Sequence, residues 1–188
     1  VLPPEQSDML QETQIPIVYH DEMRDTKGKL RVLSLFSGCG GMDLGFEGMF
    51  IANRKSFPQD SLYIDHAINK NWVMLKKTKF KTVFANDILN EAEVAWTTYM
   101  SRFGYQPEMY HNISIVDLVK MHKQGADIFP KNIEVVTGGF PCQDFSVAGK
   151  RKGFNSDKDD YGKKREGDEP SEETRGKLYY WMKQVIAT

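Results

Sequence analysis

The chain has 188 residues, of which 25 are Lys or Arg and 26 are Asp or Glu, giving a net charge of −1. This balance excludes a chain-wide cationic field, so any contact with nucleic acid must come from a local basic cluster. Two cysteines exclude a disulfide scaffold and indicate a reduced, intracellular protein. No apolar run approaches the length of a membrane span, about 18 residues, and 40% hydrophobic residues at this length predict one domain with a core.

The first part of the chain predicts a polar extension followed by a strand, a turn and a helix. Residues 1–29 are polar and contain three prolines, which indicates an extension. Residues 30–36, LRVLSLF, form an apolar run that is typical of a buried strand. The run breaks at a glycine turn, SGCGG (37–41), and residues 42–50 then show helical spacing.

Residues 50–80 are open to more than one interpretation. SLYID (61–65) indicates a strand, whereas AINKNWVMLKK (67–77) fits either a helix or an irregular insertion. The pattern becomes clear again at KTVFAND (81–87), which predicts a second strand. It is followed by residues 88–104, whose apolar side chains keep the three-to-four spacing of a helix.

The remaining segments continue the alternation of strands and helices. Residues 148–177 interrupt it, because they are dense in charge and lack hydrophobic periodicity, which predicts a mobile loop. The elements expected around that loop are a short strand near Met109 and Tyr110, a helix over 115–125 with Ser114 as its cap, a strand over 133–139, and an amphipathic helix over 178–187.

Alternating strands and helices predict an α/β fold with a mostly parallel sheet. Ligands of such sheets bind beyond the carboxyl ends of the strands, near the point where the strand order reverses. The two glycine turns, at 37–41 and 138–142, each follow a predicted strand. If the first and fourth strands are neighbours, the two turns face one crevice.

The first glycine turn is typical of a backbone that closely approaches a nucleotide-like ligand. It departs from the dinucleotide fingerprint G-x-G-x-x-G, because Gly38 and Gly40 fit but the third position is Asp43. An acidic residue at the start of a helix argues against a pyrophosphate there, and so against a nicotinamide cofactor. S-adenosylmethionine has a sulfonium cation and no phosphate, so it suits this turn. A tight turn without any ligand explains the spacing equally well.

A carboxylate at the end of the second strand is expected to accept hydrogen bonds from ribose hydroxyls. Two residues compete for this role. Asp65 lies at the usual distance after the turn, about 20 residues, whereas Asp87 lies further on but ends a clearer strand. We predict Asp87. For either residue the alternative is a helix cap or a solvated loop carboxylate.

Cys142 follows the fourth predicted strand, between Pro141 and Gln143. That position suits a small buried side chain poorly, so the thiol is a candidate nucleophile. No histidine stands beside it, and two cysteines alone make a poor metal site, so no metal is predicted. The basic cluster 150–152, Lys-Arg-Lys, either contacts a phosphate backbone or belongs to a solvated loop.

Together these segments resemble the DNA cytosine-5 methyltransferases. The resemblance covers about residues 30–188, and it implies a Rossmann-like sheet. It also implies transfer of the methyl group of S-adenosylmethionine to C5 of a cytosine flipped out of double-stranded DNA. In the family's mechanism a thiolate adds to cytosine C6, C5 then attacks the methyl group, and loss of the C5 proton expels the thiol. The segments that carry the resemblance are LFSGCGG (35–41), AND (85–87), TGGFPCQDFSVAGKRKGF (137–154) and RGKLYY (175–180).

The resemblance implies a role for each motif residue. Cys142 is the implied nucleophile, Asp87 binds the ribose, and Ile88 covers the adenine face. Asn112 stands where the family has the Asp that binds the adenine amino group, and its amide oxygen can still accept that bond. The other cofactor-binding residues implied are Phe36, Ser37, Gly38, Cys39, Gly40, Gly41, Ile113, Pro141 and Leu178. The DNA-binding residues implied are Gln143, Ser146, Lys150 and Arg175.

The family's later elements, a Glu-Asn-Val segment, an Arg-x-Arg element and a target-recognition domain, are not found in the sequence. We therefore expect residues 30–188 to be the N-terminal part of a catalytic domain, with a sheet incomplete on its C-terminal side. A C-terminal half or a second polypeptide would complete it, and alone it would be inactive or nearly so. The implied setting is bacterial restriction–modification, in the cytoplasm at the nucleoid. A tRNA cytosine-5 methyltransferase of the same family and a non-catalytic Rossmann-like ligand-binding module remain alternatives.

Overall fold

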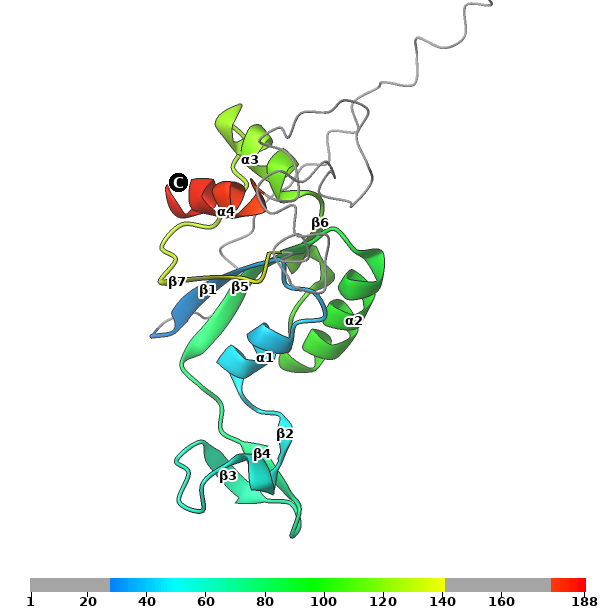
Figure 1. The fold of residues 1–188 in the computed structure, drawn as a ribbon, viewed down its shortest axis with the longest axis vertical. Helices are drawn as coiled ribbons and strands as arrows, with labels where there is room; N and C mark the ends of the chain where they lie inside the picture. Colours follow the sequence, from blue (N-terminus) through cyan, green and yellow to red (C-terminus); the bar gives the residue numbers. More distant parts are fainter. Residues whose placement is uncertain (1–27, 141–176) are drawn as a thin grey trace, which may run out of the picture.

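The computed structural model describes residues 28–140 and 177–188 (Figure 1). A four-stranded sheet forms its centre, with the strand order β6-β5-β1-β7, and each neighbouring pair is parallel. The mostly parallel α/β sheet expected from the sequence is therefore confirmed. Its strands are β1 (Leu30–Leu35), β5 (Phe80–Asp87), β6 (Tyr110–Asn112) and β7 (Val135–Gly138).

Helices cover both faces of this sheet (Figure 1). Successive strand residues point to opposite faces, so Phe84 joins the hydrophobic cluster on one side and Ala85 the cluster on the other. The helices of the Ala85 side are α1 (Gly41–Glu47) and α2 (Asn90–Met100), and those of the Phe84 side are α3 (Ile115–Lys123) and α4 (Leu178–Ile186). Short 3-10 turns are η2 (Arg54–Ser56), η3 (Ser101–Phe103) and η4 (Pro107–Met109).

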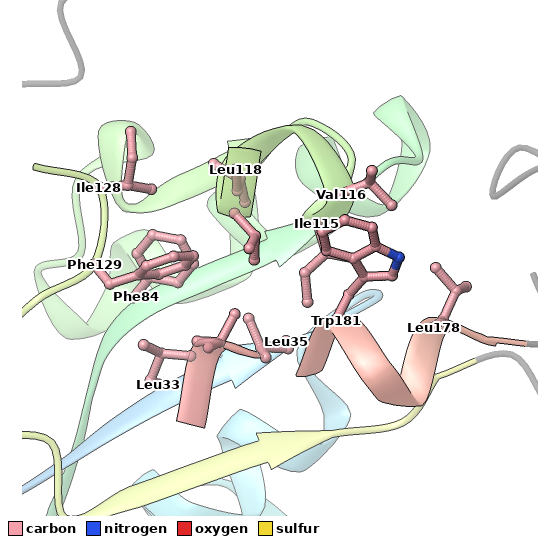
Figure 2. Close-up of a cluster of buried hydrophobic side chains, with 12 residues drawn as sticks. Leu33, Leu35, Phe84, Ile115, Val116, Leu118, Ile128, Phe129, Leu178 and Trp181 are labelled. Carbon is pink, nitrogen blue, oxygen red and sulfur yellow. The ribbon is translucent and has the colours of Figure 1, made fainter. Parts of the chain in front are cut away.

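The hydrophobic cluster on the Phe84 side joins α3 and α4 to the sheet. In α4 the buried residues Leu178, Trp181 and Val185 recur at helical spacing, so one face of the helix is apolar. Figure 2 shows Leu178 and Trp181 beside Ile115 and Val116 of α3. This packing anchors the second described segment, residues 177–188, on the first.

Residues 51–75 form a second, three-stranded antiparallel sheet, and the helical interpretation of residues 67–77 is wrong. Asn69 explains the difference: its side-chain oxygen accepts hydrogen bonds from the backbone N–H groups of Asn71 (2.9 Å) and Trp72 (3.1 Å), which closes a hairpin turn. The strand expected over 61–65 begins at Ile64. The strands are β2 (Ile51–Asn53), β3 (Ile64–Ala67) and β4 (Trp72–Leu75), in the order β2-β4-β3.

The other predicted elements are present with shifted ends. The helix expected over 42–50 ends at Glu47, because Gly48 has φ of 72°. The helix expected over 88–104 ends at Met100 and continues as η3 to a left-handed Gly104. Ser114 caps α3 as predicted, since its hydroxyl accepts a hydrogen bond from the N–H of Val116 at 3.1 Å. The extension and the mobile loop expected over 148–177 lie outside the described residues, apart from 28–29 and 177.

None of the helices within the described ranges has the length and apolar character needed to cross a membrane.

Replacing Trp181 by Ala tests the packing of α4. Trp181 is 6% exposed and lies in the cluster between α3 and the sheet. We expect its truncation to lower the free energy of unfolding by about 3–5 kcal/mol, since a large cavity forms. Ile186→Ala on the same helix is the control: Ile186 is 59% exposed, and its truncation should stay within about 0.5 kcal/mol. Equal effects in chemical denaturation would contradict this account of the core.

Candidate functional site

The candidate site lies at the carboxyl ends of β1, β5 and β7. In the sheet Leu35 pairs with Asn86 on one side and with Gly138 on the other. The condition stated for the two glycine turns, that the first and fourth predicted strands are neighbours, is thus met. The chain leaves β1 and β7 at the same edge, so the two glycine turns begin side by side.

The first glycine turn is tied to β5 by its backbone. The N–H of Ser37 donates to the carbonyl of Asn86 (2.8 Å), and the N–H of Asn86 donates to the Ser37 hydroxyl (3.1 Å). Gly38 and Gly40 have φ of 52° and 85°, a left-handed backbone that favours glycine. A Cβ at Gly38 would meet nothing within 4 Å, so one side of the turn is open to the close approach of a ligand.

Asp87 is the acidic residue that the structure brings to this turn. Its Oδ2 accepts a hydrogen bond from the N–H of Gly38 (3.0 Å), and its Oδ1 accepts from the N–H of Ile88 (2.8 Å). Asp65, the competing candidate, lies exposed in β3, where it pairs with His66 at 2.8 Å. The geometry therefore favours Asp87 over Asp65 for a ligand at the turn.

Asn112 ends β6, the neighbour of β5, and its amide is oriented by α2. The Nδ2 atom donates to Asn90 Oδ1 (2.6 Å) and to Glu93 Oε2 (2.8 Å). Because a carboxylate accepts hydrogen bonds, the nitrogen must face Glu93. The amide oxygen is therefore left as the group that can accept a bond from a ligand.

Asn86 is a structural residue of the site to which the sequence analysis gave no role. It is 1% exposed, and its Nδ2 donates to the carbonyls of His111 (2.8 Å) and Ile113 (2.7 Å). These bonds join the ends of β5 and β6, so they set the spacing between Asp87 and Asn112. Asn86 is the middle residue of the motif Ala-Asn-Asp (85–87), but the sequence does not show which groups its side chain would bind.

The second glycine turn is described as far as Phe140. The ring of Phe140 contacts that of Phe36 edge to face, with 6.4 Å between centroids. This contact brings the segment before Cys142 against the first glycine turn. The predicted site residues Pro141, Cys142, Gln143, Ser146, Lys150 and Arg175 lie outside the described residues.

Leu178 and Cys39 occupy contrasting environments among the predicted cofactor-binding residues. Cys39 is an exposed residue of the turn. Leu178 is 2% exposed and belongs to the hydrophobic cluster under α4. Its predicted contact with a cofactor stays a prediction.

The expectation that Asp43 opposes a pyrophosphate at the start of α1 rests on the wrong geometry. Asp43 is 0% exposed, and its Oδ2 accepts a hydrogen bond from Trp96 Nε1 at 2.6 Å. The side chain therefore points into the protein and not toward the open side of the turn. Burial raises the pKa of its carboxyl group. The exclusion of a nicotinamide cofactor does not follow from Asp43.

Two aromatic residues that the sequence analysis did not assign to the site support the turn from within. The hydroxyl of Tyr110 donates to the carbonyl of Gly38 (3.2 Å), and burial raises the pKa of Tyr110, which keeps this donor protonated. The Trp96 ring lies beside that of Tyr110, with 5.4 Å between centroids. Helical spacing marks Trp96 as buried, but it does not show what the ring contacts.

Within the described residues, no group of three or more His, Cys, Asp or Glu side chains is arranged to hold a metal ion.

A parallel sheet with helices on both faces, and with a glycine turn and an acidic residue at the ends of adjacent strands, is the architecture of a Rossmann-like methyltransferase fold. The chain belongs to the family of C-5 cytosine-specific DNA methylases, whose model matches residues 30–161.

Three relatives illustrate the similarity. The chain is 35% identical over 126 residues to the type II methyltransferase M.BsuRI of Bacillus subtilis. The matched region covers 65% of the chain and 25% of that protein. It is 33% identical over 140 residues to M.BspRI of Lysinibacillus sphaericus, covering 71% and 28%. It is 31% identical over 122 residues to M.HgiGI of Herpetosiphon aurantiacus, covering 65% and 67%. The chain thus spans about a quarter of the length of the first two.

His111, in the strand that ends at Asn112, predicts a pH dependence of stability. Its ring stacks on Phe84 with 4.3 Å between centroids, and burial lowers its pKa to about 4. Between pH 6.5 and 4 the unfolded histidine binds a proton that the folded one does not, so stability is lost as the pH falls through this window. The loss attributable to this residue is as much as about 3 kcal/mol.

Chemical denaturation of His111→Phe at several pH values tests this, because phenylalanine keeps the stacked ring and removes the titration. We expect the stability of the variant to fall less steeply than that of the wild type between pH 6.5 and 4. His66→Gln, at the exposed histidine of β3, should keep the wild-type slope. A His111→Phe profile parallel to the wild type would show that other groups control the acid sensitivity.

Proposed function

We propose that the protein containing this chain is a DNA cytosine-5 methyltransferase that uses S-adenosylmethionine, with Cys142 as its nucleophile. The observation that carries the proposal is the pairing of β1 with β7, together with the contact between Phe36 and Phe140. Cys142 comes two residues after Phe140 in the sequence, and a position of its thiol near the first glycine turn is part of the proposal. Family membership supports the same reaction.

The residues at the turn fit S-adenosylmethionine. The open side of Gly38 and Gly41, where an added Cβ would meet nothing within 4 Å, lets a ligand lie against the backbone. Asp87, beside Gly38, accepts hydrogen bonds from the ribose hydroxyls, and Ile88 covers the adenine face. Asn112 accepts a bond from the adenine amino group through its amide oxygen. The cofactor supplies a methyl group activated by its sulfonium.

Ser37, Cys39, Gly40 and Ile113 complete the proposed cofactor contacts on these strand ends, with Phe36 on the β7 side. Pro141 and Leu178 complete the pocket in the proposal, and Leu178 belongs to the hydrophobic cluster against which Phe36 and Phe140 pack.

Cys142 performs the covalent step in this proposal. Its thiolate adds to C6 of the flipped cytosine, and the electron pair of the C5=C6 bond then forms a bond from C5 to the methyl group. The bond between that methyl group and the sulfonium sulfur would break, with S-adenosylhomocysteine as the leaving group. Loss of the C5 proton then restores the double bond and expels the thiolate, so the enzyme is regenerated. Gln143, Ser146 and Lys150 contact the DNA, and Arg175 binds a phosphate.

The rest of the enzyme supplies what this reaction further requires. A Glu-Asn-Val segment would hold the N3 edge of the cytosine, and a target-recognition domain would read the sequence in the major groove. Both come from a C-terminal half or a second polypeptide. The relatives are type II methyltransferases, so we place the protein in bacterial restriction–modification, acting on double-stranded DNA at the nucleoid.

The role of Asp87 predicts a loss of cofactor affinity in Asp87→Asn. The amide keeps the size of the side chain but removes the negative charge, so hydrogen bonds from the ribose weaken. We expect the dissociation constant of S-adenosylhomocysteine, measured by calorimetry on the full-length protein, to rise about 10-fold to 100-fold. Asp65→Asn is the matched control and should bind like the wild type. A similar loss in both variants would indicate a general change of the fold.

The role of Cys142 predicts covalent capture of DNA that contains 5-fluorocytosine. Fluorine replaces the C5 proton, so the adduct cannot eliminate and the protein stays linked through its thiol. The full-length protein with S-adenosylmethionine should form this adduct, and Cys142→Ser should not; mass spectrometry of the linked peptide locates the bond. DNA with ordinary cytosine is the control. Adduct formation on tRNA but not on duplex DNA would instead identify an RNA methyltransferase.

A further inference from the structure

The Trp96 side chain contacts both the start of α1 and the glycine turn from the interior of the protein. Like Asp43, it is fully buried, and its Nε1 donates to Asp43 Oδ2 at 2.6 Å. A Cβ placed on Gly40 would lie 2.6 Å from Trp96 Cδ1 and 3.1 Å from Nε1. The hydrogen-bonding edge of the indole therefore occupies the space that any side chain at Gly40 would need.

The hydrogen bond to Asp43 determines how the indole lies against Gly40. A ring without that bond can rotate about its two side-chain torsions within its rotamer wells. With the bond, the edge that carries Nε1 is directed at Asp43 and stays in contact with Gly40. Gly40 has φ of 85° and precedes the first residue of α1, so this contact restrains the turn where its backbone enters the helix.

The buried Asp43 carboxyl group lowers the stability of the fold relative to an apolar side chain in the same space. Ser34 lies close enough to lower the raised pKa of Asp43 partly, but no hydrogen bond of normal geometry reaches Oδ1 from the described residues. Glu47, one helical turn further on, is a second buried carboxylate. Burying a carboxyl group with one oxygen unpaired costs stability that an apolar pair would not. The hydrogen bond between Asp43 and Trp96 fixes one geometry of the turn, which an apolar pair would not do.

We propose that the Asp43–Trp96 hydrogen bond is a positioning element for the cofactor: it holds the backbone of residues 38–41 in its binding conformation without touching the ligand. The proposal rests on the proposed function, since it assigns S-adenosylmethionine to this turn. Without the bond the turn samples more conformations, and binding must then order it. The cofactor affinity falls, while the chemistry at Cys142 does not change.

Three variants of the full-length protein test the hydrogen bond. Trp96→Phe and the double variant Asp43→Leu/Trp96→Phe remove it, whereas Asp43→Asn keeps it. Trp96→Phe retains a ring but removes the donor, and it leaves the buried carboxylate without its partner. Asp43→Asn retains an acceptor oxygen for Nε1. The double variant Asp43→Leu/Trp96→Phe also removes the carboxyl group that Trp96→Phe leaves unpaired, so part of the stability lost in Trp96→Phe is expected to return. Tyr99→Phe, on the same helix, is the control that removes one hydroxyl away from the turn.

Calorimetry with S-adenosylhomocysteine, methylation kinetics and thermal unfolding measure the outcome. We expect Trp96→Phe to raise the dissociation constant and the KM for S-adenosylmethionine on the order of tenfold, with kcat at saturating cofactor unchanged. Asp43→Asn and Tyr99→Phe should bind within about twofold of the wild type. In the double variant the melting temperature should recover in part while the affinity stays low.

Recovery of both affinity and stability in the double variant would overturn the proposal, because the bond would then be only structural. Unchanged affinity in Trp96→Phe, measured below its melting temperature, would overturn it as well. Failure of the wild type to bind S-adenosylhomocysteine would instead refute the proposed function, so the two failures are distinguishable.

Discussion

The central place of β1 in the sheet constrains where every group of the candidate site can lie. β1 pairs in parallel with β5 on one side and with β7 on the other, so three chain segments leave the sheet at one edge. The glycine turn follows β1, Asp87 ends β5, and the segment that leads to Cys142 follows β7. Any slip of one strand by one residue would reverse its side chains between the two faces, so the hydrophobic clusters on both faces hold this register.

The helix that follows the glycine turn is held by polar contacts in the interior. Glu47 of α1 accepts hydrogen bonds from the N–H of Thr82 at 2.7 Å and from the hydroxyl of Tyr105. Asp43, one turn earlier, accepts the bond from Trp96. Both carboxylates thus join α1 to elements that lie far away in the sequence. Because directional bonds admit fewer geometries than apolar contacts, a seven-residue helix with little surface to bury is still fixed in orientation.

The sequence predicted the site best where the chemistry is local. A glycine turn after an apolar strand, and an acidic residue that ends the next clear strand, indicated that Asp87 rather than Asp65 lies beside the turn, and the structure joins Asp87 to Gly38. The partners of buried polar residues were not predictable in this way. Asp43 was interpreted as unfavourable for a pyrophosphate, because the sequence shows its place at the start of a helix but not that Trp96, 53 residues later, lies within hydrogen-bond distance.

The missed strands of the small sheet have a related cause. Residues 72–75, Trp-Val-Met-Leu, are all apolar, so the alternation of a strand is hidden in the sequence. In the structure Val73 and Leu75 are buried, whereas Trp72 is exposed and Met74 half-buried. The period of two is present in the burial but not in the residue types. The turn at Asn69 decides that these residues form strands and not a helix. That turn is recognised only from the hydrogen bonds that the Asn69 side chain makes in the structure.

The small sheet is an insertion that leaves the site unchanged, because the chain segments before and after it are hydrogen-bonded to each other. The N–H of Thr78 donates to the carbonyl of Glu47 (3.0 Å), and that of Met49 donates to Lys76 (3.3 Å), with an isolated bridge between Gly48 and Lys77. Gly48 permits this closure, since a Cβ there would lie 2.0 Å from the Lys76 carbonyl oxygen. Residues 49–77 therefore form a closed excursion between α1 and β5. It lies at the amino ends of the parallel strands, opposite the glycine turn (Figure 1), so its length and sequence can vary while the geometry between Gly38 and Asp87 stays fixed.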